Sequence, residues 1–425
     1  MKLLIKNARV LDENGIENIS DISLDEHKIS TIEKEIKCDS DDFIDAKSNY
    51  VLPGLIDVSC KTCVSGYEYK EDIMNVSKSA AKGGITTLTA SPNTNPIIDS
   101  RTVVEYIDGQ NKKSSLINIF QYGSMTKNME GKAISNIGDM HGAGIVAISD
   151  GGVSVLDSNL LSNIFRYSTM FELPVITFCD DTTISKNGVV NNGIISTITG
   201  LRGMRREAEE TLVARNMILA KHTNARLHIT NISTKGSVEL IKIAKNMGLN
   251  VTCDTCPHYF TLTEDYLEDY NTVFKVRPPL RTQEDVEAIV EGLFDGTIDI
   301  ISSGHSPSTC NQKNTEFDNA SFGISSLETA FLVSYNALVK DRKMNFKFML
   351  DKFTKNPAKL LGISNKGVLE EGKDADFFIF DKNLDTTIVS KDFASRAKFS
   401  PYDNQTFSGK IKFTIVGGRI VFINQ

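Results

Sequence analysis

The pattern of apolar and polar positions separates a long central part of the chain from its two ends. In the central part, short apolar runs alternate with amphipathic stretches, which is typical of repeated βα units and therefore of a parallel barrel. The expected strands are 52–58, 85–91, 144–149, 174–179, 225–232, 250–256 and 297–303. Apolar residues at helical spacing predict helices between them, including 207–223 and 237–248.

The two ends of the chain share a different pattern. Residues 1–51 contain short alternating runs separated by Asn-Gly and acidic turns, which indicates an antiparallel sheet. Residues 366–425 repeat this pattern, with two runs around the turn at Gly417 and Gly418. We therefore predict an α/β protein in which a (β/α)8 TIM-like barrel at 52–365 carries a small β-sandwich domain built from both termini.

Composition places the chain among ordinary globular proteins. Of its 425 residues 40% are hydrophobic and 24% charged, and the net charge is -7. An acidic balance without a Lys/Arg cluster argues against nucleic acid or an anionic membrane as partner. No segment approaches the roughly 18 apolar residues of a membrane span, and the N-terminal apolar run is too short for a signal peptide. A cytoplasmic protein with reduced cysteines is expected.

Several motifs lie at the ends of the predicted strands, where barrels of this kind carry their active sites. They include VLPGLIDVSCKTC (51–63), Glu71-Asp72, PNTNP (92–96), Ser233-Thr234, Pro257-His258, PPLR (278–281), Phe322-Gly323 and NPA (356–358). This ordered set closely resembles the dihydroorotases, cyclic-amide hydrolases of the metal-dependent amidohydrolase superfamily. The resemblance covers nearly the whole chain. It implies the barrel of the metal-dependent hydrolases and a place in pyrimidine biosynthesis.

The metal ligands that the resemblance assigns are replaced in this chain. The family's histidine and aspartate ligand positions are Ser59, Lys61, Gly151, Phe178 and Asn231. Zinc takes three or four nitrogen, sulfur or carboxylate ligands, and hydrolysis of an unactivated cyclic amide uses the metal to generate a nucleophilic water. We therefore expect neither a metal cofactor nor catalytic residues.

The positions that the resemblance assigns to catalysis and substrate binding are also altered. The position that the resemblance assigns to the general base is occupied by Gly304 in this chain. The position assigned to a carboxylate-binding arginine is occupied by Cys63, which cannot form a bidentate contact. The residual substrate-pocket residues are Asn93, Arg277, His305 and Cys63. Arg277 either supplies the missing positive charge or is a solvated loop residue, which we favour. His305 is interpreted as a packing or supporting residue rather than a ligand.

Lys61 has two interpretations. Its ammonium group either replaces the metal charge by pairing with Asp150 or Asp180, or extends to solvent. We favour the first, which predicts that Lys61→Met destabilises the fold.

A rebuilt zinc or redox site is the alternative. Its ligands would come from Cys63, Asp150, Cys179, Asp180 and Cys256. Cys60 is expected to point away from the barrel mouth, because side chains alternate along a strand. Buried free thiols are the favoured interpretation of the cysteines.

These observations lead to three functional hypotheses. The preferred one is a non-catalytic dihydroorotase homologue, a pseudoenzyme that acts as a scaffold or regulatory partner of aspartate transcarbamoylase in a homo- or hetero-oligomer, as the resemblance implies. The second is an active dihydroorotase, interconverting carbamoyl-aspartate and dihydroorotate, or a related cyclic-amide hydrolase, with an unusual zinc site. The third is a metal-free binder of a small acidic metabolite through Asn93 and Arg277.

Overall fold

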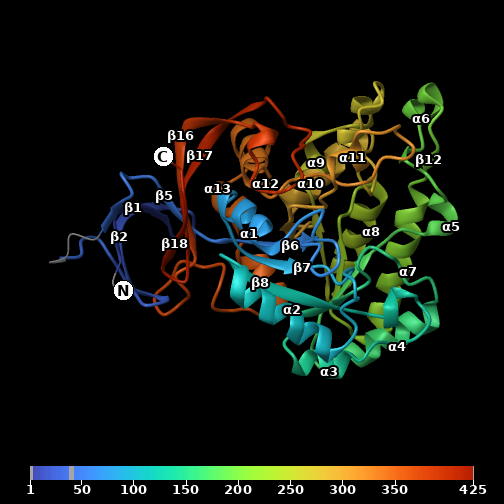
Figure 1. The fold of residues 1–425 in the computed structure, drawn as a ribbon, viewed down its shortest axis with the longest axis horizontal. Coiled ribbons are helices and arrows are strands. Elements are labelled where there is room, and N and C mark those ends of the chain that lie inside the picture. The colour runs from blue at the N-terminus through green and yellow to red at the C-terminus, as the bar shows by residue number, and fades with distance from the viewer. Residues whose placement is uncertain (1–2, 38–42, 425) are drawn as a thin grey trace.

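The computed structural model describes residues 3–37 and 43–424. They form a parallel barrel and, beside it, a sheet to which both ends of the chain contribute (Figure 1). This arrangement confirms the predicted fold class. None of the described helices is both long and apolar enough to cross a membrane.

The barrel strands follow one another around the ring in chain order. They are β6 (Leu55–Cys60), β7 (Ile85–Ala90), β8 (Asn118–Ser124), β9 (Ala147–Ser149), β10 (Val175–Phe178), β13 (Leu227–Thr230), β14 (Val251–Thr255) and β15 (Ile300–Ile301). A parallel bridge between Cys60 and His305 brings β6 beside the segment after β15, so the ring is nearly closed. β8 has no counterpart among the predicted strands, because its apolar residues are interrupted by Gln121 and Gly123.

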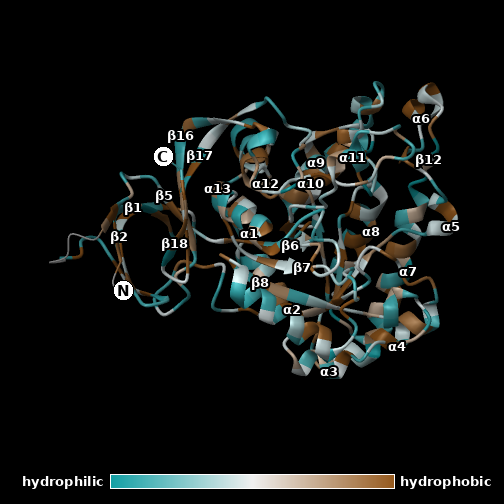
Figure 2. Cartoon of the chain, in the orientation of Figure 1, coloured by the Kyte–Doolittle hydropathy of each residue, from teal (hydrophilic) through white to brown (hydrophobic). Residues whose placement is uncertain are grey.

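The barrel strands are buried on both faces because helices cover the outside of the ring. Every residue of β7 is buried, for example. The helices are α1 (Ile73–Lys82), α2 (Arg101–Ser114), α3 (Ile137–Gly142), α4 (Ser158–Thr169), α5 (Thr182–Ser185), α6 (Ile194–Thr199), α7 (Glu207–Thr223), α8 (Lys235–Asn246), α9 (Pro257–Thr261), α10 (Gln283–Asp295), α11 (Cys310–Lys313), α12 (Ala330–Ser334), α13 (Phe346–Asp351) and α14 (Lys355–Leu361). Figure 2 shows hydrophilic and hydrophobic residues mixed along outer helices such as α4 and α7.

Shorter elements decorate the loops of the barrel. The strands β11 (Val190–Asn191) and β12 (Gly203–Met204) pair with each other. Short helical turns are η1 (Lys127–Met129), η2 (Glu264–Leu267), η3 (Thr272–Phe274), the π-helical η4 (Tyr335–Asp341) and η5 (Ser390–Asp392).

Local signals explain the ends of the two predicted helices. α7 matches the predicted range and ends where Asn224 adopts a left-handed φ of 56°. α8 begins two residues earlier than predicted, because the side chain of Thr234 accepts a hydrogen bond from the backbone of Ser237 and caps the helix there.

The terminal sheet joins strands from opposite ends of the chain. Its strands are β1 (Leu4–Leu11), β2 (Glu17–Asp25), β3 (Lys28–Glu33), β4 (Phe43–Asp45), β5 (Tyr50–Pro53), β16 (Phe377–Thr387), β17 (Thr406–Val416) and β18 (Arg419–Ile423). β5 pairs antiparallel with β16, so that Val51 lies opposite Ile379. Both of these side chains belong to a core that also contains Ile22 and Phe377. This pairing ties the N-terminal strands to the C-terminal ones just before the chain enters the barrel.

Candidate functional site

A cavity of about 260 Å³ opens at the carboxyl ends of the barrel strands. It brings together most of the positions singled out from the sequence: Ser59, Lys61, Gly151, Phe178, Asn231, Cys256, Arg277, Gly304 and His305 all line it. Strand ends from around the whole ring therefore meet at one site, as the parallel barrel requires.

Three of these residues are hydrogen-bonded to one another. The Ser59 hydroxyl donates to Asn231 Oδ1 over 3.3 Å, and the Cys256 thiol donates to the same oxygen over 3.0 Å. Cys256 Sγ also lies 3.3 Å from the Ser302 hydroxyl oxygen. The amide oxygen of Asn231, at a position that the family resemblance assigns to a metal ligand, thus accepts hydrogen bonds from two protein donors.

The hydrogen bonds continue from Ser302 into the barrel interior. The Ser302 hydroxyl donates to Asp254 Oδ1 over 2.6 Å, and His228 Nε2 lies 2.8 Å from Asp254 Oδ2. The backbone amide of Asn231 donates to Asp254 Oδ1 as well. All of the side chains of Ser302, Asp254 and His228 are buried. The carboxylate of Asp254 is therefore satisfied by protein donors behind the cavity wall.

The aspartate position after β9 is filled differently. Asp150 does not line the cavity: its carboxylate accepts from the backbone amides of Phe178 at 2.9 Å and Gly152 at 3.2 Å. Burial raises the pKa of Asp150 to about 7. Gly151 has a φ of +60°, and a Cβ there would lie 2.6 Å from Met129 Cε. An aspartate therefore does not fit at 151 unless Met129 moves.

The general-base position is closed by neighbouring side chains. Gly304 has a φ of +63°, and a Cβ there would lie 2.6 Å from Cys256 Sγ and 3.1 Å from His258 Cε1. Real Cβ atoms essentially never approach a heavy atom so closely. The thiol of Cys256 thus occupies the space that a side chain at position 304 would need.

The pairing of the charged residues differs from the prediction. Arg277 Nε donates to Asp180 Oδ2 over 2.7 Å, a second guanidinium nitrogen contacts the same oxygen, and the guanidinium lies over the Phe322 ring. Arg277 lies in a loop and is exposed, as the favoured interpretation expects, and it also contributes positive charge to the cavity wall.

The prediction that Lys61 pairs with Asp150 or Asp180 is wrong. Asp180 pairs with Arg277, and Asp150 accepts hydrogen bonds from backbone amides. Within the described residues the Lys61 side chain makes no hydrogen bond or ion pair, although it lines the cavity. Burial lowers the pKa of Lys61, the nearby Cys63 acts to raise it, and the positive charges of Lys70 and Arg277 lower it further.

Two residues expected in the substrate pocket lie outside the cavity wall. Neither Asn93 nor Cys63 is among the described residues that line it. β6 ends at Cys60, and the chain turns at Cys63, which has a left-handed φ of 61°. Burial raises the pKa of the Cys63 thiol to about 11. The residues that face the cavity are thus a different set from the one predicted for substrate binding.

The alternative zinc ligands are not brought together. The Cys179 sulfur accepts from Asn216 Nδ2 at 3.5 Å, and burial raises the pKa values of Cys179 and Cys256. Cys60 belongs to the buried core that also contains Val76 and Ala80 of α1, in agreement with the expected orientation away from the barrel mouth, although it is also among the residues that line the cavity. The described parts of the chain contain no group of three or more His, Cys, Asp or Glu residues that could hold a metal. The residues present do not fit zinc.

Two buried histidines support the cavity floor. Burial lowers the pKa of His258 to about 3, and its Nδ1 has no hydrogen-bond partner within the described residues. His305 Nδ1 accepts from the Ser326 amide at 3.3 Å, and its Nε2 lies 3.6 Å from Glu71 Oε2. His258 is therefore a neutral imidazole at neutral pH.

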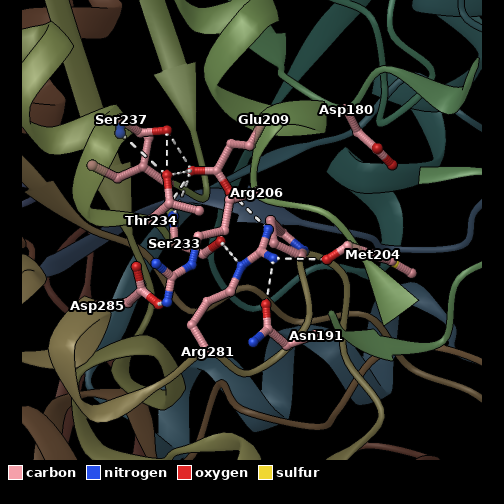
Figure 3. Close-up of polar contacts among 12 residues, drawn as sticks. Asp180, Asn191, Met204, Arg206, Glu209, Ser233, Thr234, Ser237, Arg281 and Asp285 are labelled. Carbon is pink, nitrogen blue, oxygen red and sulfur yellow. Dashed lines mark hydrogen bonds and ion pairs between the residues drawn. The ribbon is translucent and has the colours of Figure 1, made fainter. Parts of the chain in front are cut away.

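Sequence reasoning missed a buried polar cluster that holds the loops around the cavity (Figure 3). Arg281, the last residue of PPLR, donates to Ser233 Oγ at 3.1 Å and to Asn191 Oδ1 at 2.9 Å. Glu209 accepts from the Ser233 backbone at 2.9 Å and from the Ser237 hydroxyl at 2.8 Å. The available signal was the occurrence of PPLR and Ser233-Thr234 together. These motifs stabilise the fold beside the cavity and do not line it.

Comparison with known proteins connects this architecture to enzymes. A family model described as dihydro-orotase-like matches residues 48–237, and one described as the amidohydrolase family matches residues 209–421. The chain is 43% identical over 419 residues to the dihydroorotase of Ruminiclostridium cellulolyticum, covering 98% of each chain. It is 43% identical over 420 residues to that of Acetivibrio thermocellus, covering 99% of this chain and 98% of the relative.

Solved structures share the whole fold. The L-hydantoinase (dihydropyrimidinase) of Arthrobacter aurescens superposes with a TM-score of 0.90 at 25% identity, covering 100% of this chain and 97% of that chain. The dihydropyrimidinase of Brevibacillus agri has a TM-score of 0.85 at 20% identity, covering 100% of this chain and 95% of that chain, which shows the fold alone.

Proposed function

The chain belongs to the dihydroorotase family, and we propose that within this family it is a homologue that does not hydrolyse cyclic amides. The family suggests zinc as a cofactor, and zinc would supply the activated water that attacks the amide. The ligand positions of this chain do not fit that ion, so no hydrolytic step can be derived from its residues.

One observation carries the proposal. Ser59 and Asn231 are the ligand positions that still carry a side-chain oxygen. Asn231 Oδ1 accepts hydrogen bonds from the Ser59 hydroxyl and from the Cys256 thiol. A missing ligand in an otherwise open site leaves donors pointing at a gap, whereas here the replaced positions satisfy one another's hydrogen bonds. The thiol of Cys256 also fills the space that a catalytic base at position 304 would need.

The proposal includes a role as a structural partner. A chain that keeps the full barrel without metal chemistry can still present its outer surface, and the family resemblance points to aspartate transcarbamoylase as the partner. Co-purification of the two proteins at a fixed stoichiometry, from the cell in which both occur, would support this role. Separate elution on size-exclusion chromatography would contradict it.

A direct test is dihydroorotate turnover in both directions by the purified protein with added zinc. The Ruminiclostridium cellulolyticum relative, purified and assayed in parallel, serves as the matched control. We expect the relative to turn over dihydroorotate. For this chain we expect no rate above that of the uncatalysed reaction.

The second candidate is an active dihydroorotase with an unusual metal site. The names of the relatives and their 43% identity over nearly the whole chain favour it. Turnover that a chelator abolishes and zinc restores would establish this candidate and overturn the first. Turnover that a chelator leaves unchanged would also overturn the first, and would point to chemistry without a metal.

A further inference from the structure

Two exposed isoleucines lie on one face of α6. Ile194 is 73% exposed and Ile198 is 67% exposed, and residues four positions apart lie on the same side of a helix. Ile195 is buried in a cluster with Leu267 of η2, against which α6 packs. The helix is therefore anchored by its inner face, while its outer face keeps two large apolar side chains in water.

Two exposed tyrosines extend this outer face. The Tyr270 hydroxyl donates to the Thr199 carbonyl over 2.7 Å, which places Tyr270 beside the end of α6. Tyr266 of η2 stacks on Phe274, with ring centroids 5.1 Å apart. Grouped aromatic and large aliphatic side chains in water are typical of protein interfaces. We define the α6 surface as Ile194, Ile198, Tyr266 and Tyr270.

The α6 surface lies at one extreme of the molecule. Along the longest axis, α6 is at the end opposite the terminal sheet (Figure 1), and it carries hydrophobic residues there (Figure 2). The strands β11 and β12 and the turn η2 support it from the barrel side. A partner can therefore reach this surface without meeting the terminal sheet.

Unpaired charges of both signs flank the α6 surface. Lys186 and Arg202 come from the β11–β12 side, and Glu268 and Asp269 follow η2. All four are exposed, and none forms an ion pair within the described residues. In a two-fold symmetric contact, residue i of one copy meets residue j of the other, and j meets i. An apolar centre with a basic side and an acidic side is therefore complementary to a second copy of itself.

A second exposed apolar pair lacks these charges. Ile243 and Met247 lie one turn apart at the end of α8 and are exposed. The lysines of that helix are all used within the chain: Lys235 pairs with Glu284, Lys242 with Asp295 and Lys245 with Asp299. The α8 pair has a similar apolar character without an unpaired lysine on its helix, so it serves as a matched control.

We propose that the α6 surface binds the α6 surface of a second copy of this chain, in a two-fold symmetric dimer in which Arg202 of each copy faces Glu268 and Asp269 of the other. The inference goes beyond the proposed function, because a chain without hydrolytic activity does not require it and aspartate transcarbamoylase has no part in it.

Sedimentation equilibrium of the purified full chain at micromolar concentrations tests the apolar contact. We expect a dimer. Ile194→Ser combined with Ile198→Ser should raise its dissociation constant about tenfold or more, because large apolar side chains leave water at the contact. Ile243→Ser combined with Met247→Ser should leave it unchanged, with both variants checked by circular dichroism. A monomeric parent, which would leave the α6 surface to a different protein, or equal weakening by the two double variants, would overturn the proposal.

A pair of charge-reversed variants tests the symmetry. Arg202→Glu in one variant, and Glu268→Arg with Asp269→Arg in another, should each weaken the dimer because like charges then face each other. An equimolar mixture should regain the parent's affinity, since opposite charges meet again at both contacts of the mixed dimer. Variants that dimerise like the parent, or a mixture as weak as its components, would overturn the proposal. This result decides the matter by itself if the isoleucine variant does not fold.

Zinc content and dihydroorotate turnover do not enter these readouts. The dimer can therefore fail without the proposed function failing, and the reverse also holds.

Discussion

At the scale of single residues, the substitutions at the ligand positions are fitted to one another. Removal of the side chain at position 304 makes room for the thiol of Cys256, and this thiol in turn bonds to Asn231. A side chain introduced at position 304 would therefore meet the thiol of Cys256. The site behaves as a packed unit rather than as a metal site with parts missing.

Gly304→Asp tests this packing. We expect it to lower the free energy of unfolding by about 1–3 kcal/mol more than Gly131→Asp, because residue 131 has a similar φ of +68° and nothing within 4 Å of its Cβ position. The difference isolates the clash with Cys256 from the cost of the left-handed backbone. Urea unfolding curves measure both variants, and adding Cys256→Ala to Gly304→Asp should recover part of the loss. Equal losses at 304 and 131 would show that the cavity accepts the side chain.

Lys61→Met has an expected effect opposite to the one predicted from sequence. A half-buried ammonium without a counter-ion costs free energy, and methionine fills a similar volume without charge. Burial lowers the pKa of Lys61 from 10.5, so the cost is present at neutral pH and fades as the pH approaches 10.5. Thermal unfolding at pH 7 should give the variant a midpoint at or above that of the parent. A clearly lower midpoint would indicate that Lys61 has a stabilising partner.

Asp150→Asn should change how stability depends on pH. Because the folded-state pKa of Asp150 is about 7 and the unfolded value is near 3.8, the folded protein keeps a proton that the unfolded chain has lost between these values. The protonated carboxyl of Asp150 therefore contributes roughly 2–4 kcal/mol to the free energy of unfolding. This contribution is complete below about pH 4 and is lost as the pH rises through 7. The unfolding free energy of the parent should therefore fall relative to that of the variant by this amount across this range. A constant difference would contradict the raised pKa.

At the scale of secondary-structure elements, the motifs shared with the family hold loops in place around the cavity. Arg281 joins the loop after η3 to the segment at Ser233 and to Asn191 on β11. Glu71 accepts hydrogen bonds from Ser395 and from the backbone of Arg396, which lie more than 300 residues further along the chain. Shared motifs therefore account for the fold, and the altered positions account for the cavity.

Arg281→Met should be among the more damaging single changes outside the core. The side chains of Arg281 and Glu209 are each only 4% exposed, so the variant leaves a buried carboxylate without its arginine, at a cost of about 3–5 kcal/mol. Arg205→Met removes an exposed pair with Glu207 near the start of the same helix, and its cost should be far smaller because solvent screens this pair. Chemical denaturation compares the two. Similar midpoints would mean that the cluster around Glu209 does not stabilise the fold.

Sequence patterns were sufficient for elements whose signal is local. The buried runs of β6 and β7 and the full extent of α7 were predicted, because apolar spacing and helix ends are encoded within a few residues. β8 was missed because its polar residues interrupt the apolar run.

Contacts between distant residues were less predictable. The pairing of Arg277 with Asp180 joins residues 97 positions apart, and nothing near either residue indicates the other. The exclusion of Asn93 and Cys63 from the cavity depends on the paths of the loops after β7 and β6, which residue types alone do not fix.

At the scale of the whole molecule, the barrel and the terminal sheet are those of the amidohydrolases, with a TM-score of 0.90 to a hydantoinase. Within this shared fold, the chain replaces the metal-ligand positions that the family resemblance assigns, at the cavity where the barrel strands end. The central claim is that this cavity does not hold zinc.

The measurement that tests this claim most directly is the zinc content of the purified protein, by elemental analysis after expression in zinc-supplemented medium and desalting without chelator. The account predicts well under one zinc per chain, with no decrease on Asp150→Asn or Cys256→Ala. About one zinc or more per chain, lost in either variant, would contradict it, because those side chains would then be ligands.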